Sequence, residues 1–469
     1  MTTDDAVAEL RRQLDPAKVL TDEAVRHGLS RDRSQWVQPE LAAVVVKPAD
    51  ESDVVTTLKV AHHYRLPVIP RGAGSGLSGG TVGLNEAIVL DVTEMASVIE
   101  LDPRGKWATV QPGVITADLD RQAAEHGLMF APDPASTELS TIGGNIAANA
   151  GGLRCVKYGN TRDSVLSLKV VLATGEKLTL GSKTKKDVAG LDLMSLFVGS
   201  EGTLGVITEA TVRLVPRPAQ RRMLLAVCRT WEEVEALAVT ASAMPQTPSM
   251  VELIDHGGLQ NRSEELKAPL GLEDTGRAVA LIESDSPYAE QDVAEYRREL
   301  TAAGLSDLRL LSDQEREAAL RLRRGKAAEG KGDAQILDTS RLWWLGEDMT
   351  VPAPYLARFL REAETIAAEA GVRISMVAHV GDGNLHPALT IPKEEVSSEQ
   401  TASEMLNQTA DRLVRIALSL GGSVTGEHGV GVLKKEWLPM MLGEESLRIQ
   451  HSIKEIFDPH GIMNPGRGY

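Results

Sequence analysis

Residues 70–80, PRGAGSGLSGG, restrict the fold of this chain more than any other feature. Gly74, Gly76 and Gly79 satisfy the G-x-G-x-x-G pattern, which in a Rossmann site follows a strand and opens a helix. The run LPVIP supplies the strand, but TVGLNEAIVLDV follows the glycines and predicts a turn and a second strand. Because no room is left for the helix, the sequence predicts a helix-free loop and argues against an NAD-dependent Rossmann enzyme.

The density of glycine nevertheless favours phosphate binding. Successive backbone N–H groups of such a loop can converge on an anion without a helix dipole. Two further segments have the same character, STIGGNIAANAGG at 140–152 and GSEGTLGVITEA at 199–210. Three such loops in one region predict an extended ligand laid across a surface, and three unrelated turns are the alternative.

Length and composition limit the number of domains, the classes of ligand and the cellular location to expect. A chain of 469 residues exceeds the size of one hydrophobic core, so two domains, or one with an insertion, are expected. A net charge of -16 argues against nucleic-acid or anionic-membrane binding. Cys155 and Cys228 make no disulfide framework or cluster motif, and the N-terminus lacks a secretory signal. We therefore expect a cytoplasmic protein without a transmembrane segment.

The order of apolar runs predicts two differently built regions. Strand-like runs at 42–46, 68–70, 87–90, 108–110 and 165–172 alternate with helical segments at 52–63 and 115–126. After the linker-like VPRPAQRR, helices at 231–244 and 287–304 alternate with strands at 223–228 and 278–282. This second alternation is typical of a ferredoxin-like α+β domain. The Gly- and Pro-rich residues 421–469 are expected to pack back onto the first region.

The most specific chemistry lies in ISMVAHVGDGNLHPALTI, residues 374–391. Two strand-like runs flank GDGN, a hairpin turn composition. We expect Val380 to pair with Leu385 and His379 with His386. Directly opposed residues share a face of the sheet, so both imidazoles could reach one metal ion.

A third ligand is suggested by TGEHGVG, residues 425–431. Flanking glycines allow Glu427 and His428 to place both side chains in one pocket. A set of two histidines and a carboxylate leaves coordination positions open, as catalytic Zn, Mn or Fe sites do. A metal-dependent hydrolase could use the same ligands, although the glycine loops would then lack a purpose.

The combined motifs resemble those of the FAD-dependent D-2-hydroxyacid dehydrogenases, which include D-lactate dehydrogenase, the glycolate oxidase catalytic subunit and D-2-hydroxyglutarate dehydrogenase. They are PRGAGSGLSGG, PDPAS, TIGGNIAANAGG, YGNTRD, GSEGTLGVITEA, HVGDGNLHP, GEHGVG and FDPHGIMNPG, in the family's order from about residue 40. The resemblance implies an α+β fold with a vanillyl-alcohol-oxidase-like (PCMH-type) FAD domain at 1–217, its core at about 40–217. It further implies a cap domain carrying the metal hairpin at 218–420, and an active site completed by 421–469.

The resemblance also implies roles for individual residues. His379, His386 and Glu427 match the family's divalent-metal ligands, His428 its catalytic base and Arg323 its substrate-carboxylate arginine, although Leu320 replaces a tryptophan three residues earlier. The implied FAD contacts are Arg71, Gly72, Ala73, Gly74, Ser75, Gly79, Gly80, Pro132, Ser136, Thr141, Gly143, Gly144, Asn145, Gly202, Thr203, Gly205, Val206, Ile207 and Asn464. The FAD is expected to be non-covalent, because no histidine occurs in the first loop.

Two departures from the family's pattern narrow the substrate. Glutarate-specific members carry an asparagine and a lysine where this chain has Ala388 and Gly346. A site without them suits a monocarboxylic acid such as D-lactate or glycolate, although Arg341 could substitute and keeps D-2-hydroxyglutarate open. A non-catalytic FAD-binding subunit would not need the histidine motifs.

Little in the sequence identifies the protein's partners. The electron acceptor stays open among dioxygen, a quinone, a cytochrome, an electron-transfer flavoprotein and an iron–sulfur subunit, and an acceptor in the membrane would place the protein peripherally there. We expect a homodimer.

Overall fold

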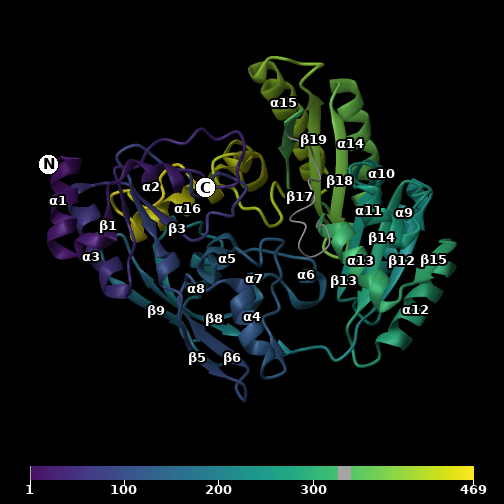
Figure 1. Cartoon of the computed structure of the whole chain (residues 1–469), viewed down its shortest axis with the longest axis horizontal. Helices are drawn as coiled ribbons and strands as arrows, with labels where there is room; N and C mark the ends of the chain where they lie inside the picture. Colours follow the sequence, from purple (N-terminus) through teal and green to yellow (C-terminus); the bar gives the residue numbers. More distant parts are fainter. Residues whose placement is uncertain (1, 326–339) are drawn as a thin grey trace. The chain divides into compact units, whose positions relative to one another are not determined.

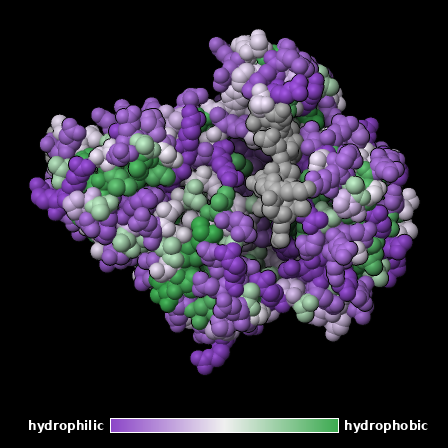
Figure 2. All heavy atoms as spheres, in the orientation of Figure 1, coloured by the Kyte–Doolittle hydropathy of each residue, from purple (hydrophilic) through white to green (hydrophobic). Residues whose placement is uncertain are grey.

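The computed structural model describes residues 2–325 and 340–469 and divides into two compact units (Figure 1). The first unit is built from Met1–Gly152, Gly159–Arg217 and Glu427–Tyr469, and the second from Leu153–Tyr158 and Pro218–Gly426. Polar side chains dominate the visible surface of each unit, with apolar side chains in separate patches (Figure 2). No helix in the described residues is long and apolar enough to cross a lipid bilayer.

The first unit contains a sheet with strand order β1-β2-β4-β3. Its strands are β1 (Val19–Leu20), β2 (Val44–Val46), β3 (Val68–Arg71) and β4 (Ile88–Asp91), and β4 runs parallel to both β2 and β3. Helix α3 (Glu51–Tyr64) begins after Asp50, whose carboxylate accepts from two backbone N–H groups of the first turn. Helix α1 (Thr3–Gln13) contacts α3, and α2 (Glu23–Gly28) contacts β2.

A second, antiparallel sheet of this unit has the order β5-β6-β10-β8-β9. Its strands are β5 (Val98–Asp102), β6 (Trp107–Val110), β8 (Val165–Val171), β9 (Lys177–Gly181) and β10 (Val206–Arg213). A short pair, β7 (Leu128–Met129) and β11 (Val215–Pro216), stands apart from it. The helices here are α4 (Thr116–Ala124), α5 (Ile142–Ala148), α7 (Thr161–Ser164) and α8 (Met194–Phe197).

The glycine segments adopt three different conformations. In the described chain no helix lies between Gly80 and β4, so the helix-free first loop is confirmed. The second segment, treated above as a loop, instead contains α5, because the hydroxyl of Thr141 caps it by accepting from the N–H of Gly144. The third segment is a turn that leads into β10.

The end of the chain belongs to the first unit. After α16 (Leu438–Phe457), Met463 forms a parallel bridge with Val68 of β3, and Ile462 and Met463 are buried in the core beneath the first sheet. The C-terminal segment therefore packs back onto this unit, as expected.

The second unit is built on one antiparallel sheet with the order β15-β12-β14-β13-β18-β19-β16, while β17 also pairs with β19. The strands are β12 (Arg222–Cys228), β13 (Met250–Asp255), β14 (Ala278–Ser284), β15 (Asp307–Leu310), β16 (Leu342–Gly346), β17 (Met349–Thr350), β18 (Arg373–His379) and β19 (Asn384–Pro392). Its first part, β12-α9-β13-β14-α12-β15, has the ferredoxin-like arrangement, with α9 (Trp231–Ala243) and α12 (Ala289–Ala302) as the crossing helices.

Further helices pack against this sheet (Figure 1). Helices α14 (Leu356–Ala370) and α15 (Glu399–Ser419) contact each other and the strands β18 and β19. Helix α13 (Asp313–Arg324) packs against β12, while α10 (His256–Gln260) contacts β13 and β18. Two short helices, α6 (Cys155–Tyr158) and α11 (Glu264–Lys267), also belong to this unit. Met250 and Ile254 of β13 share a buried apolar cluster with Ala318 and Leu322 of α13.

The predicted pairing of the histidine hairpin is wrong. His379 pairs with Asn384, and Ala378, not Val380, pairs with Leu385. The N–H of Val380 donates to the carbonyl of Val251 in the neighbouring strand β13, at 2.8 Å. Gly383, at φ 78°, closes a four-residue loop by donating to His379 O at 2.9 Å. The register therefore shifts by two residues, which keeps His379 and His386 on one face as diagonal neighbours.

Candidate functional site

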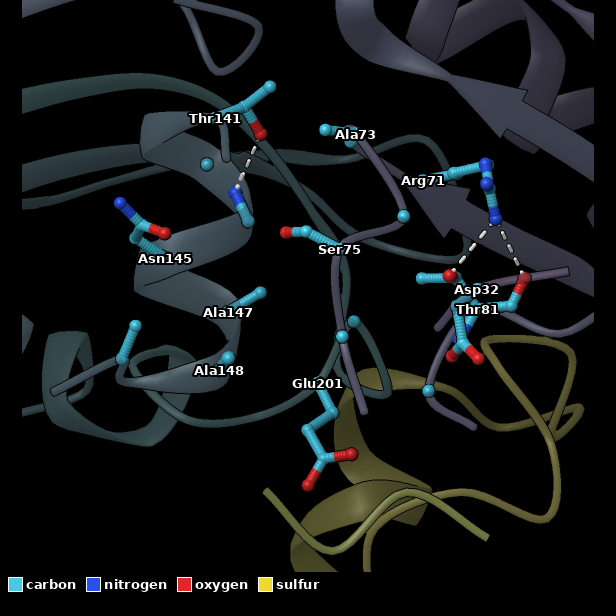
Figure 3. Close-up of a pocket in the computed structure, with 18 of the residues that line it drawn as sticks. Asp32, Arg71, Ala73, Ser75, Thr81, Thr141, Asn145, Ala147, Ala148 and Glu201 are labelled. Atoms are coloured by element: carbon cyan, nitrogen blue, oxygen red, sulfur yellow. Dashed lines mark hydrogen bonds between the residues drawn. The ribbon is translucent and has the colours of Figure 1, made fainter. Parts of the chain in front are cut away.

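A cavity of about 320 Å³ lies in the first unit and is lined by all three glycine segments (Figure 3). Most of the predicted cofactor-binding residues line it. These are Arg71, Gly72, Ala73, Gly74, Ser75, Gly80, Ser136, Thr141, Gly143, Gly144, Asn145, Gly202, Gly205, Val206 and Ile207. Glu427 and His428 line the same cavity. One surface thus collects segments that are more than 300 residues apart in the chain.

Arg71 holds the first glycine loop in shape. Its guanidinium is buried and donates to the carbonyl and hydroxyl oxygens of Thr81 at 3.2 and 3.1 Å, and to Arg31 O at 2.8 Å (Figure 3). Asp32, also on the cavity wall, accepts from the N–H of Thr81 at 3.3 Å. Residues that precede the glycine loop by about 40 positions therefore fix its conformation.

The first two glycine segments approach each other closely at Gly72. A Cβ on Gly72 would collide with the hydroxyl of Thr141, the cap of α5. Asn145 of the same helix donates to Thr116 Oγ1 at 2.7 Å and is buried. Glycine is required here for the fit of backbone against helix, independently of any ligand.

Glu201, from the third glycine segment, was not predicted and anchors the loop that carries His428. Its carboxylate accepts from the backbone N–H groups of Val430 and Gly431 at 2.6 and 2.7 Å. Burial raises the pKa of Glu201, and these two N–H groups act in the opposite direction. In Figure 3 the side chain of Glu201 points toward the yellow-green ribbon of the C-terminal segment.

Ser78 of the first segment makes a second attachment to this loop. Its hydroxyl donates to the carbonyl oxygens of His428 and Gly429 at 3.2 and 3.0 Å. Its own carbonyl accepts from the N–H of Val432 at 2.8 Å, and a Cβ on Gly431 would collide with that oxygen. The backbone at and just after His428 is therefore held by residues of the first and third glycine segments.

Four predicted cofactor residues do not line the cavity, namely Gly79, Pro132, Thr203 and Asn464. The amide of Asn464 donates to the carbonyls of Gly80 and Glu201 at 2.9 and 2.7 Å, so it ties the first and third segments together. Thr203 donates to Ser200 O at 2.6 Å. The structure thus gives both residues partners within the loops.

The second unit brings together the histidines and the predicted arginine. The rings of His379 and His386 meet edge to face with centroids 5.1 Å apart. Nδ1 of His379 lies 2.6 Å from Glu252 Oε1, and Nε of Arg323 donates to Glu252 Oε2 at 2.5 Å. Arg262 braces the end of α13 by donating to Leu322 O at 2.9 Å. With Nδ1 of His379 engaged, its Nε2 is the nitrogen suited to a metal, so the two imidazoles fit the predicted donor set.

Asp348 orders the last residues of this unit. It is fully buried and accepts from the hydroxyl of Thr425 at 2.6 Å and from the N–H of Gly426 at 2.8 Å. Its other oxygen lies 3.7 Å from Nδ1 of His386. Glu427 follows Gly426 directly in the chain and begins the last segment of the first unit.

Glu201, Glu252 and Asp348 were not predicted from the sequence. A signal existed for Glu252, because an acidic residue interrupts the apolar run MVELI, and acidic residues are rarely buried without a partner. Glu201 carried a weaker signal, namely an acidic residue in a glycine-rich turn. Only the fold reveals the partners of either residue.

Comparison with known proteins gives matches over nearly the whole chain. Residues 42–181 match a model described as "FAD binding domain", and residues 217–467 match one described as "FAD linked oxidases, C-terminal domain". The chain is 37% identical to the glycolate oxidase subunit GlcD of Bacillus subtilis, covering 100% of this chain and 97% of that protein. It is 31% identical to a D-lactate dehydrogenase of Anaerostipes hadrus, covering 97% of this chain and 95% of that protein.

A solved structure resembles the whole fold. p-Cresol methylhydroxylase with substrate bound aligns with a TM-score of 0.78 at 16% identity, over 99% of this chain and 96% of that chain. The likeness confirms the predicted α+β architecture of the PCMH-type FAD oxidases.

Proposed function

Because the chain belongs to the FAD-dependent D-2-hydroxyacid dehydrogenases, a family of FAD-linked oxidoreductases, we propose that it oxidises a monocarboxylic D-2-hydroxyacid, such as D-lactate or glycolate, to the 2-oxoacid. The observation that carries this proposal is the single cavity lined by three glycine segments with His428 on its wall. Bound FAD would supply the hydride acceptor.

Side chains of this protein would remove the proton, bind the substrate carboxylate and hold the metal. His428 would accept the hydroxyl proton, and Arg323 would bind the carboxylate of the substrate. His379, His386 and Glu427 would hold a divalent metal, which would act as a Lewis acid toward the hydroxyl group. The backbone clamps from Glu201 and Ser78 support this assignment, because a base must stay within hydrogen-bond reach of the proton it removes.

The preference for a monocarboxylic acid rests on two positions that are neighbours in the sheet. Gly346 of β16 and Ala388 of β19 are direct cross-strand partners. In glutarate-specific relatives the matching positions carry lysine and asparagine, which would recognise a second carboxylate. Hydrogen and methyl side chains offer no such donor, so D-lactate or glycolate is the better fit.

The proposal is tested by anaerobic flavin bleaching. The purified protein is mixed in turn with D-lactate, L-lactate, glycolate and D-2-hydroxyglutarate while the flavin absorbance is followed. We expect rapid bleaching by D-lactate or glycolate and none by L-lactate, whereas His428→Ala should keep its flavin and lose at least 100-fold in reduction rate. A colourless protein would overturn the proposal in favour of a metal-dependent hydrolase. Preferential bleaching by D-2-hydroxyglutarate would overturn it in favour of a D-2-hydroxyglutarate dehydrogenase.

A further inference from the structure

Glu252 is a buried acidic residue in the sheet of the second unit. It lies in the middle of β13, directly opposite His379 of β18, and its side chain is only 1% exposed. The two-residue period of a strand places it on the same face as Met250 and Ile254, which pack against α13. This face brings the carboxylate to Arg323 at the end of that helix.

The two carboxylate oxygens of Glu252 bind two different groups. Oε1 lies 2.6 Å from Nδ1 of His379, and Oε2 accepts from Nε of Arg323 at 2.5 Å. The side chains of these partners are themselves 7% and 10% exposed, so the bridge lies in a region with little water. Such charge-assisted hydrogen bonds are strong and directional, and each fixes the orientation of the ring or the guanidinium it holds.

We propose that Glu252 is a positioning residue that orients the imidazole of His379 toward a metal ion and the guanidinium of Arg323 toward the substrate carboxylate at the same time. The inference rests on the proposed function, since it assigns Glu252 to the metal and the anion anchor of that site. By accepting from Nδ1, Glu252 sets the tautomer in which Nε2 carries the lone pair. By binding Nε of Arg323, it leaves the two terminal nitrogens to fork toward an anion.

The same sheet contains a matched control. Glu283 of β14 is fully buried, lies opposite Met250 in the adjacent strand and accepts from Arg154 at 3.0 Å and from Ser249 Oγ at 3.1 Å. It is a buried, arginine-bonded glutamate like Glu252, but among the described residues its side-chain partners are Arg154, Ser249 and Arg316 rather than either histidine. Its second oxygen lies 3.5 Å from Arg316 of α13, the helix that also carries Arg323. Glu283→Gln therefore reproduces the loss of a buried charge and of a contact with α13, while the carboxylate between His379 and Arg323 stays intact.

The test measures metal binding on the intact flavoprotein. Wild type, Glu252→Gln, Glu283→Gln and His379→Ala are freed of metal with FAD retained, and Mn²⁺ alone is titrated by electron paramagnetic resonance. We expect Glu252→Gln to bind Mn²⁺ 10- to 100-fold more weakly, Glu283→Gln to match wild type, and His379→Ala to lose the site. At saturating Mn²⁺, Glu252→Gln should still raise KM for D-lactate several-fold, because Arg323 has lost its partner.

The outcomes separate the two hypotheses. Wild-type affinity in Glu252→Gln together with loss in His379→Ala would overturn the role of Glu252 and leave the metal site standing. Equal losses in the two glutamine variants would also overturn it. Mn²⁺ binding that survives His379→Ala would overturn the metal site instead.

A measurement on the wild type serves if Glu252→Gln does not fold. Nitrogen-15 spectra of labelled histidine, assigned with His379→Ala, report which ring nitrogen carries the proton. We expect the Nδ1–H tautomer for His379 in the metal-free flavoprotein, and an Nε2–H tautomer would overturn the inference.

Discussion

At the scale of single residues, the proposed base is held by carboxylate and hydroxyl groups that perform no chemistry themselves. Glu201 binds the backbone on the C-terminal side of His428, and Ser78 binds the carbonyl of His428 itself. The histidine side chain is thereby positioned through its main chain. A substitution that weakens the clamp should reduce catalysis while leaving the cavity able to hold the flavin.

We expect Glu201→Gln to slow flavin reduction by D-lactate about tenfold or more. A carboxamide offers one acceptor oxygen in place of two, so one of the N–H groups of Val430 and Gly431 loses its partner, a loss worth about 1.5–3 kcal/mol for a bond to a charged group. Glu209 of the same segment binds the half-exposed Lys169, and Glu209→Gln is the control that should behave as wild type. Stopped-flow absorbance measures the rate, and an unchanged rate in Glu201→Gln would show that the clamp is dispensable.

At the scale of secondary-structure elements, sequence periodicity predicted the strongly patterned strands and helices, because the apolar pattern itself drives their burial. The expected helix at 52–63 is α3, and the expected strand at 223–228 lies within β12. The register of the β18-β19 hairpin could not be predicted in this way. The N–H of Val380 binds β13, a strand more than 120 residues earlier, and this bond moves the four-residue loop one position toward the N-terminus without changing its length.

The short helix α10 gives an element-level prediction of pH dependence. Asp255 caps it by accepting from Gly258 N at 2.6 Å and also accepts from Met376 N at 2.8 Å. Burial raises the pKa of Asp255 to about 7. A raised carboxyl pKa means that folding favours the protonated form, so the stability contributed by this group is lost as pH rises from about 4 to 7.

We therefore expect Asp255→Asn to raise the thermal midpoint at pH 8 and to lose most of this advantage toward pH 4.5. Asparagine keeps an oxygen for both N–H donors and removes the buried charge, and about three pKa units correspond to roughly 4 kcal/mol at 1.4 kcal/mol each. Thermal unfolding followed by circular dichroism at several pH values measures the difference. A constant offset across this range would contradict the raised pKa.

At the scale of the whole molecule, the first unit is completed by the end of the chain. Ile462 is 2% exposed in the core under the first sheet, and its carbonyl accepts from the N–H of Val68 at 2.8 Å. Ile456, six residues earlier, is 76% exposed. Substituting each of these two isoleucines therefore distinguishes the contribution of core packing from the effect of removing an exposed apolar side chain.

We expect Ile462→Ala to lower the free energy of unfolding by about 2–4 kcal/mol, and Ile456→Ala to change it by less than about 0.5 kcal/mol. Because β3 leads directly into the first glycine loop, the first variant should also release FAD at a lower temperature. Denaturant unfolding and flavin fluorescence during heating measure the two effects. Equal stability of the variants would contradict the packing of the C-terminal segment.

Metal removal is the remaining test of the proposed chemistry. Dialysis against a chelator should abolish 2-hydroxyacid oxidation while the flavin stays bound, and Mn²⁺ or Zn²⁺ should restore it. Activity and flavin absorbance are measured on the same sample. An enzyme that is insensitive to chelation would rule out a catalytic metal.

The sequence by itself determined the helix-free glycine loop, the strongly patterned strands and helices, the family and the placement of His379 and His386 on one face of a hairpin. These features follow from local patterns, because backbone preferences and strand alternation act over a few residues. The tertiary structure alone decided the hairpin register and the partners of Glu201 and Glu252. Glu252 lies 127 residues from His379 and 71 from Arg323 in the sequence. The role of a buried carboxylate depends on its hydrogen-bond partners, and only folding brings these partners to it.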